Sequence, residues 1–158
     1  MSHKNDTIRI AVIGGREASP DALDFAFKVG KLLAEHGVIL YSGGGSGVME
    51  AASRGASEAG GMVVGILKEI DGSDANQYIQ VPILTGVGDL RNSLIIRSVH
   101  GAIAVEGAYG TLSEIAYTLG YGKPMVGFNS WDIEGLYVVE TAETAVEKVL
   151  QMIKATRS

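Results

Sequence analysis

The sequence predicts one α/β domain built on a doubly wound, mostly parallel sheet of the Rossmann-like type, with helices on both faces. Short, almost wholly apolar runs alternate with stretches of helix length, as in sheets that are covered on both sides. Several of these runs end in glycines, which mark the entry of a strand into a turn. The 158 residues suit one domain, which we expect over residues 8–158 after a disordered lead-in of residues 1–7.

The first half of the chain is predicted to form a β-α-β-α-β unit. The run Ile8–Gly14 is rich in β-branched residues and ends in a glycine pair. Residues 19–21, Ser-Pro-Asp, supply a cap, a favourable first helical residue and an acid at the positive end of the helix dipole, and Gly37 ends this helix. The elements expected next are a strand at Val38–Ser42, a helix from about Val48 to Ala59 and a strand at Met62–Leu67.

The second half continues the same alternation after a polar loop at residues 68–77. We expect an extended segment at Tyr78–Leu84 and a helix over Leu90–Val99 that Asp89 caps. The remaining predicted elements are a strand from Gly101, a helix at Leu112–Tyr121, a strand from Pro124, a short edge strand at Tyr137–Val139 and a helix at Ala142–Lys154. In such a sheet, ligands bind beyond the carboxyl ends of the strands, where the strand order reverses.

The composition excludes several classes of function. The chain has no cysteine, which excludes a disulfide framework, a thiolate zinc site and thiol catalysis. Its net charge of −5 argues against nucleic acid as a partner, because phosphate backbones are bound by accumulated lysine and arginine. The N-terminus has no apolar signal segment and no apolar run is long enough to span a bilayer. We therefore expect a cytoplasmic protein with no membrane partner, no metal and no cofactor.

Two glycine-rich turns between a strand and a helix form the candidate ligand site, together with Gly14 at the end of the first strand. The first turn contributes Gly43, Gly44, Gly45, Gly47 and Met49. The second contributes Gly107, Ala108, Tyr109, Gly110 and Thr111. Free N–H groups at a helix N-terminus bind anions, so we predict a small phosphorylated ligand. Alternatively, the glycines of the first turn only permit a tight bend and close helix packing.

Neither turn matches a common nucleotide-binding fingerprint. The dinucleotide motif G-x-G-x-x-G, started from Gly43, would need glycine where the chain has Val48. A P-loop is also absent, because Gly122-Lys123 is followed by Pro124 instead of serine or threonine. Dehydrogenases that use NAD and P-loop NTPases are therefore disfavoured.

Two charged residues beside these turns are candidate catalytic groups. Arg91 lies in the first turn of a predicted helix, where the dipole disfavours a cation, although a solvated surface arginine is an ordinary alternative. Glu114 follows Thr111 at the spacing of a capping box. Its carboxylate therefore either accepts a hydrogen bond from a free backbone N–H at the helix start or contacts a ligand. The tyrosines Tyr109, Tyr117 and Tyr121 either stack on a base or belong to the core or an interface. For Arg97 and His100 we expect surface or subunit contacts.

On these residues the sequence resembles the LOG-like (SLOG) superfamily, formerly called lysine decarboxylase-like. It is most similar to the short bacterial Rossmann-like members and to the molybdenum cofactor carrier proteins. The signature of the phosphoribohydrolases in this superfamily is an Arg-Lys pair followed, after a helix and a strand, by P-G-G-x-G-T-x-x-E. Arg91 and Glu114 fall on the motif arginine and glutamate, and Gly107, Gly110 and Thr111 fall on its phosphate loop. The first glycine turn resembles the family's earlier glycine-rich turn.

The resemblance implies one of two functions. The first is hydrolysis of the N-glycosidic bond of nucleoside 5′-monophosphates, with Arg91 and Glu114 as the catalytic residues. The second is binding or carriage, without turnover, of a phosphorylated ligand such as molybdenum cofactor or a nucleotide. The motif is altered, because Glu106-Gly107-Ala108 stands for Pro-Gly-Gly and Asn92 for the lysine. An acid at position 106 would repel an anion unless it points away.

The resemblance also implies a homo-oligomer, either a dimer or a tetramer. The small residues Ala51, Ala52, Gly55, Ala56 and Ala59 would suit close packing of their helix, either between subunits or within the chain. The old name does not fit the chemistry, since neither glycine turn contains a lysine that could form a Schiff base.

Overall fold

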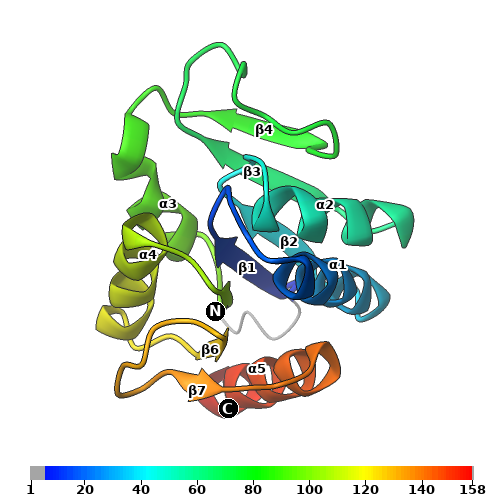
Figure 1. The fold of residues 1–158 in the computed structure, drawn as a ribbon, viewed down its shortest axis with the longest axis vertical. Coiled ribbons are helices and arrows are strands. Elements are labelled where there is room, and N and C mark those ends of the chain that lie inside the picture. Colours follow the sequence, from blue (N-terminus) through cyan, green and yellow to red (C-terminus); the bar gives the residue numbers. More distant parts are fainter. Residues whose placement is uncertain (1–5, 158) are drawn as a thin grey trace.

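The computed structural model describes residues 6–157, which form a parallel seven-stranded sheet (Figure 1). Residues 1–5 of the predicted lead-in and Ser158 lie outside the described residues. The strands, in spatial order, are β4 (Val81–Leu84), β3 (Val63–Leu67), β2 (Ile39–Ser42), β1 (Arg9–Gly14), β5 (Gly101–Val105), β6 (Met125–Phe128) and β7 (Tyr137–Val138). The predicted fold class is confirmed. Every strand pairing is parallel, whereas the prediction was a mostly parallel sheet.

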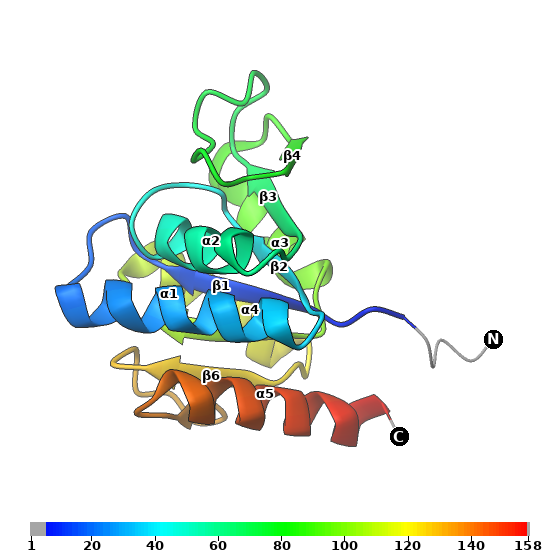
Figure 2. The same ribbon diagram turned by 90° about the vertical axis from the view of Figure 1, so that its right-hand side faces the viewer.

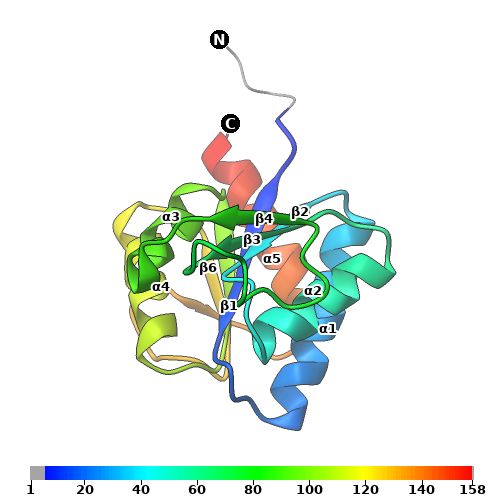
Figure 3. The same ribbon diagram turned by 90° about the horizontal axis from the view of Figure 1, so that it is seen from above.

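Five helices cover the two faces of the described sheet. One face carries α1 (Pro20–Glu35), α2 (Val48–Glu58) and α5 (Ala142–Arg157), which lie in front of the sheet in Figure 2. The opposite face carries α3 (Arg91–Arg97) and α4 (Tyr109–Gly120), which lie across the sheet from α1 and α2 in Figure 3. Alternate residues of β1 divide between the two cores, with Ile10 and Val12 on the first and Ala11 and Ile13 on the second. No described helix is long and apolar enough to cross a bilayer.

The strand order reverses beside β1. The chain steps outward from β1 through β2 and β3 to β4, then returns through α3 to place β5 on the other side of β1. The last registered pair between these two strands joins Gly14 to Val105. The loops that leave this pair must part toward opposite faces, so a crevice opens at the carboxyl ends of β1 and β5.

Three local predictions at element boundaries are wrong. Asp89 does not cap a helix: a 3-10 turn, η1 (Gly88–Leu90), precedes α3 with no side-chain cap. Thr111 and Glu114 form no capping box, because α4 begins at Tyr109. Its N-cap residue is Ala108, which makes no side-chain hydrogen bond to the helix. The predicted extended segment is also shorter, since β4 begins at Val81. By contrast, the predicted cap of α1 is confirmed, because the Ser19 hydroxyl accepts a hydrogen bond from the Ala22 amide at 3.1 Å.

Helices α1 and α2 pack closely through glycines. A Cβ atom on Gly30 of α1 would overlap the backbone carbonyl of Ala52, and one on Gly55 of α2 would overlap that of Phe27. Ala52, Gly55 and Ala56 are buried in this contact. The small-residue face of α2 therefore serves packing within the chain.

Substituting Gly30 by alanine should lower the free energy of unfolding by about 1–3 kcal/mol, because the backbones of α1 and α2 must separate to admit the methyl group. Gly120→Ala is the matched control. Gly120 also lies in a helix, but a Cβ atom there meets no heavy atom within 4 Å. The control should be neutral or stabilising by up to about 1 kcal/mol. Urea denaturation followed by circular dichroism measures both, and equal losses would contradict the packing argument.

Candidate functional site

A cleft of about 160 Å³ opens at the carboxyl ends of β1 and β5. The start of α2 contributes Met49 from one side, and the start of α4 contributes Gly110 and Thr111 from the other. The remaining lining residues are Gly14, Gly15, Arg16, Lys68, Asp89, Arg91, Asn92, Ala108 and Glu114. The structure thus brings Arg91 and Glu114 into one cleft with parts of both turns.

Arg91, the first residue of α3, holds the ends of two strands together. Its Nη1 donates hydrogen bonds to the carbonyl oxygens of Gly43, at 2.6 Å, and Ile66, at 2.7 Å. The guanidinium lies against Gly43, where a Cβ atom would come within 2.5 Å of Nη1. Burial lowers the pKa of Arg91, and the negative charges of Glu114 and Asp74 oppose that effect. Since Arg91 is only 7% exposed, it is a fixed part of the site and no surface arginine.

Asn92 stands where the family motif has lysine, and it positions Arg91. Its Oδ1 accepts a hydrogen bond from the Arg91 Nε at 2.7 Å, while its Nδ2 donates to the Ser113 hydroxyl at 3.1 Å. Ser113 in turn donates to the Gly110 carbonyl at 2.6 Å. The asparagine therefore links α3 to the first turn of α4, a role that a lysine at this position would not fill.

Glu114 is a buried carboxyl group in the wall of the cleft. It is 8% exposed, and no described residue donates a hydrogen bond to its carboxyl oxygens. Burial raises the pKa of Glu114 to about 8, although the positive charges of Arg91 and Lys68 act in the opposite direction. The group is therefore largely protonated at neutral pH and is able to donate a proton.

The first glycine turn is mostly buried beneath the cleft. The Asn76 side-chain amide donates to the carbonyl oxygens of Gly44, at 3.2 Å, and Gly45, at 2.9 Å, and the Gly44 amide donates to the Ser42 hydroxyl at 3.0 Å. Gly47 has a φ of 70° and lies against the carbonyl groups of Gly15 and Arg16. Of the predicted residues in this turn, only Met49 lines the cleft. Ligand binding by the four glycines remains a prediction.

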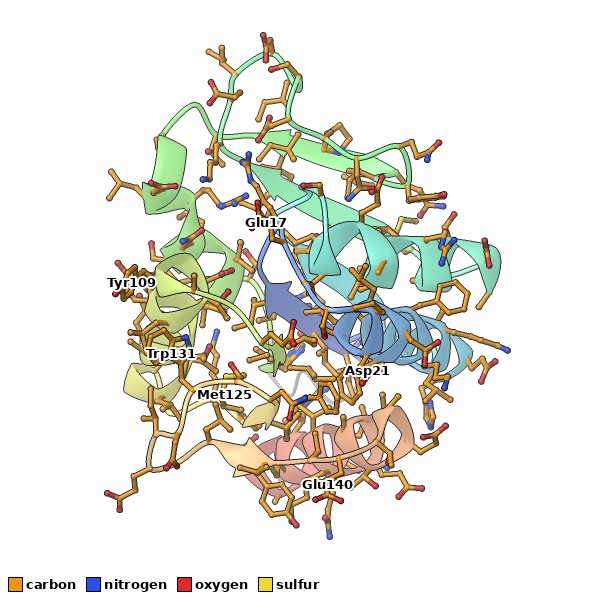
Figure 4. The ribbon with its side chains drawn as sticks, in the orientation of Figure 1. Glu17, Asp21, Tyr109, Met125, Trp131 and Glu140 are labelled. Atoms are coloured by element: carbon orange, nitrogen blue, oxygen red, sulfur yellow. The ribbon has the colours of Figure 1, made fainter. Side chains whose placement is uncertain are left out.

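The second turn faces the cleft more directly. Ala108, Gly110 and Thr111 line it, whereas Tyr109 points into an adjoining hollow. Gly107, at a φ of 102°, leaves room for the Thr111 side chain, which a Cβ atom there would overlap. The indole nitrogen of Trp131, the single tryptophan of the sequence, donates to the Ala108 carbonyl at 3.2 Å. The Trp131 ring lies 6.1 Å from that of Tyr109 (Figure 4), so its fluorescence should report on this turn.

Glu106, the acid that begins the altered motif, points away from the cleft. Its backbone has a φ of 47°, and its carboxylate accepts hydrogen bonds from the Ser19 amide at 3.0 Å and the Ser19 hydroxyl at 2.9 Å. The negative charge therefore lies at the N-terminus of α1, where the helix dipole stabilises it. The expected repulsion of an anion by Glu106 is avoided.

Arg16, Lys68, Asp89 and Asn92 were not among the predicted site residues. Arg16 follows the glycines that end β1, and Lys68 directly follows β3, so their position at the carboxyl ends of strands was an available signal. With Arg91 they place three cations around the cleft, against Asp89 and a largely protonated Glu114. The cleft therefore has a positive character in a chain whose net charge is −5.

A larger hollow of about 260 Å³ between α1 and α5 is acidic. Asp21 and Glu140 (Figure 4), together with Asp24 and Glu143, line it beside one lysine, Lys28. Such a surface repels a phosphorylated ligand. Within residues 6–157 no cluster of histidine, aspartate and glutamate is suited to holding a metal ion. The cleft at β1 and β5 is accordingly the candidate site.

Fold and cleft together define a Rossmann-like α/β protein whose candidate site lies at the topological switch point, between the starts of two helices. The model of the SLOG cluster4 family matches residues 7–157, and the chain belongs to this family. The resemblance to LOG-like proteins expected from the two turns is thereby confirmed.

Comparison with individual proteins agrees with this membership. The chain is 41% identical over 143 residues to an uncharacterised protein of Archaeoglobus fulgidus, a match that covers 88% of this chain and 92% of that protein. It is 32% identical to the rice cytokinin riboside 5′-monophosphate phosphoribohydrolase LOG, over 78% of this chain but only 52% of the rice protein.

Two solved structures are also similar. The molybdenum cofactor binding protein of Rippkaea orientalis superposes with a TM-score of 0.89 at 30% identity, over 94% of this chain and 99% of that chain. The molybdenum cofactor carrier protein of Chlamydomonas reinhardtii superposes with a TM-score of 0.86 at 31% identity, over 95% and 99% of the two chains.

The raised pKa of Glu114 should appear in the pH dependence of stability. An unfolded-chain glutamate titrates near 4.5, so the folded state holds an extra proton between about pH 4.5 and pH 8. This contribution to stability is complete below pH 4.5 and is lost as the pH rises through 8. From pH 5 to pH 9 the wild type should therefore lose on the order of 2 kcal/mol or more relative to Glu114→Gln.

Denaturation of both proteins across this pH range measures the difference. Glu147→Gln on the exposed face of α5 is the control and should follow the wild type. Parallel stability profiles for the wild type and Glu114→Gln would show that Glu114 titrates normally.

Proposed function

We propose that the cleft binds a nucleoside 5′-monophosphate and hydrolyses its N-glycosidic bond. The observation that carries the proposal is a buried carboxyl group with a raised pKa, Glu114, within a cleft of positive character at the start of α4. Hydrolysis at an anomeric carbon needs both an acid for the leaving group and a negative charge for an oxocarbenium-like transition state. One carboxyl group with a raised pKa supplies them in succession.

The reaction would run in the following order. The amide groups at the start of α4 and the cations of the cleft hold the 5′-phosphate, which places the ribose against Glu114. Glu114 donates its proton to a ring nitrogen of the base as the bond between the base and the anomeric carbon breaks. The resulting carboxylate stabilises the cationic sugar and takes a proton from the attacking water, whose hydroxyl forms ribose 5-phosphate. Glu114 is thereby protonated again, and the products are the free base and ribose 5-phosphate.

The family supports this proposal in part. The rice relative is named for cleavage of a riboside 5′-monophosphate, and the chain spans about half of that protein's length. Arg91 and Glu114, which fall on its family's motif, lie together in the cleft. Arg91 would orient Glu114 and the ligand while its Nη1 and Nε stay bound within the chain.

Glu114→Gln should reduce the release of base from AMP by at least about 100-fold, because it removes the proton donor. Affinity for AMP, measured through Trp131 fluorescence, should change little, since glutamine keeps the shape of the side chain. Chromatographic detection of free base measures the first effect. If the wild type releases no base from AMP, GMP, CMP or UMP, the hydrolase proposal is wrong.

A second candidate function is binding or carriage of a phosphorylated pterin without turnover. It is favoured by the two molybdenum cofactor proteins, each of which is covered over 99% of its length. In that case the same assay gives a fluorescence change with ligand and no product.

We also propose that the chain forms a homo-oligomer, dimer or tetramer, through the free face of β4. Val81 and Ile83 pair with Val64 and Ile66 of β3, whose side chains lie in the core beneath α3. Nevertheless Val81 is 42% and Ile83 43% exposed, because no described helix packs closely against this strand. Leu94 of α3 is exposed as well. A second copy of the chain would bury this apolar surface.

Ile83→Glu should convert the oligomer to a monomer, because a charge at the centre of an apolar interface is left unpaired. Light scattering after size exclusion measures the mass. Val138→Glu, at an exposed position on the opposite edge of the sheet, is the matched control and should keep the wild-type mass. A monomeric wild type would contradict the proposal.

A further inference from the structure

We propose that Lys68 is the exchangeable cation of the cleft, whose ammonium group leaves Asp89 for the phosphate of the ligand. Lys68 would then determine specificity for a phosphorylated ligand over its unphosphorylated counterpart. This inference rests on the proposed binding of a phosphorylated ligand, but not on its turnover.

Arg91 cannot turn toward a ligand, because its Nη1 and Nε are already committed within the chain. Nη1 bridges the ends of β2 and β3 through the carbonyl groups of Gly43 and Ile66, and Nε donates to Asn92. Reorienting the guanidinium would leave both buried carbonyl oxygens without a donor, which is costly. The guanidinium of Arg91 therefore stays in place with only Nη2 not committed to another described residue, so a cation that moves toward a ligand must come from another residue.

Lys68 combines a fixed backbone with an ammonium group that is held by a single ion pair within residues 6–157. The Lys68 amide donates to the Asp74 carboxylate at 3.0 Å, and the Lys68 carbonyl accepts from the Gly88 amide at 3.2 Å. In the described part of the chain its ammonium group has one ionic partner, Asp89, at 2.5 Å. The Asp89 side chain is 84% exposed. An ion pair with such an exposed partner contributes little stability, so its exchange for a phosphate is inexpensive.

The ion pair lies at the junction between two spaces. Lys68 and Asp89 line both the cleft and an adjoining hollow of about 510 Å³, which Leu90, Tyr109 and other residues of η1 and α4 also line. When the ammonium group turns toward a phosphate in the cleft, the bridge across this junction opens. The phosphate and ribose would then lie in the cleft, and the base would extend into the hollow. Asp89 competes with the ligand for the same cation.

A double-mutant cycle with Lys68→Met and Asp89→Asn tests this competition, with AMP, adenosine and inorganic phosphate as probes. Lys68→Met should weaken AMP binding about tenfold or more and leave adenosine binding nearly unchanged, because one charge-assisted contact to phosphate is lost. Asp89→Asn should strengthen AMP binding several-fold, since it frees the ammonium group. In the Lys68→Met background Asp89→Asn should have no effect. Calorimetry gives all the affinities.

An exposed ion pair elsewhere provides the matched control. Lys28 and Asp24 of α1 lie 2.9 Å apart, and Lys28→Met and Asp24→Asn make the same changes in net charge outside the cleft. They should leave AMP affinity unchanged. Lys68→Arg keeps the charge and should keep the preference for AMP over adenosine, which separates the loss of a cation from a packing defect.

The outcomes distinguish this inference from the proposed function. If the wild type binds neither AMP nor inorganic phosphate, the proposed function fails and the inference fails with it. If the wild type binds AMP and Lys68→Met binds it equally well, the function stands and the role of Lys68 is refuted. Additive effects of the two substitutions would refute the competition between Asp89 and the ligand.

Discussion

The buried guanidinium of Arg91 is the contact on which the rest of the site depends. Through one nitrogen it joins the carboxyl ends of β2 and β3, and through another it engages Asn92, which reaches α4. Four elements that are distant in the sequence therefore share one geometry at the cleft. The same contact requires glycine at position 43, because any side chain there would occupy the place of the guanidinium.

The electrostatics of the cleft follow from this buried cation. Glu114 lies close enough to Arg91 to be stabilised as a carboxylate, yet burial prevails and its pKa rises. Because the carboxyl group of Glu114 is largely neutral, it does not offset the positive charges of Arg16, Lys68 and Arg91 around the cleft. A chain with a net charge of −5 thus has a cleft of locally positive character, whereas the hollow between α1 and α5 is acidic.

The fold was predictable from local pattern, whereas the roles within the site were only partly so. Apolar runs, several of which end in glycines, predicted the strands, their largely parallel direction and the edge where the candidate site lies. The partners of those glycines could not be read from the sequence, because Arg91 and Gly43 are 48 residues apart. The capping box failed because α4 begins two residues before Thr111. Lys68 and Arg16 were not predicted as site residues, because a charged residue after a strand is equally typical of an ordinary polar loop.

The contact between Glu106 and Ser19 gives the two walls of the cleft different mechanical properties. It fastens the turn before α4 to the start of α1, and the Trp131 indole holds the same turn from its other side. These contacts hold that wall in place from both sides. The opposite wall, at residues 88–90, is tied to Lys68, directly after β3, by one backbone hydrogen bond and an exposed ion pair. Displacement of residues 88–90 would accordingly break fewer contacts than displacement of the turn before α4, which is the wall that carries Glu114.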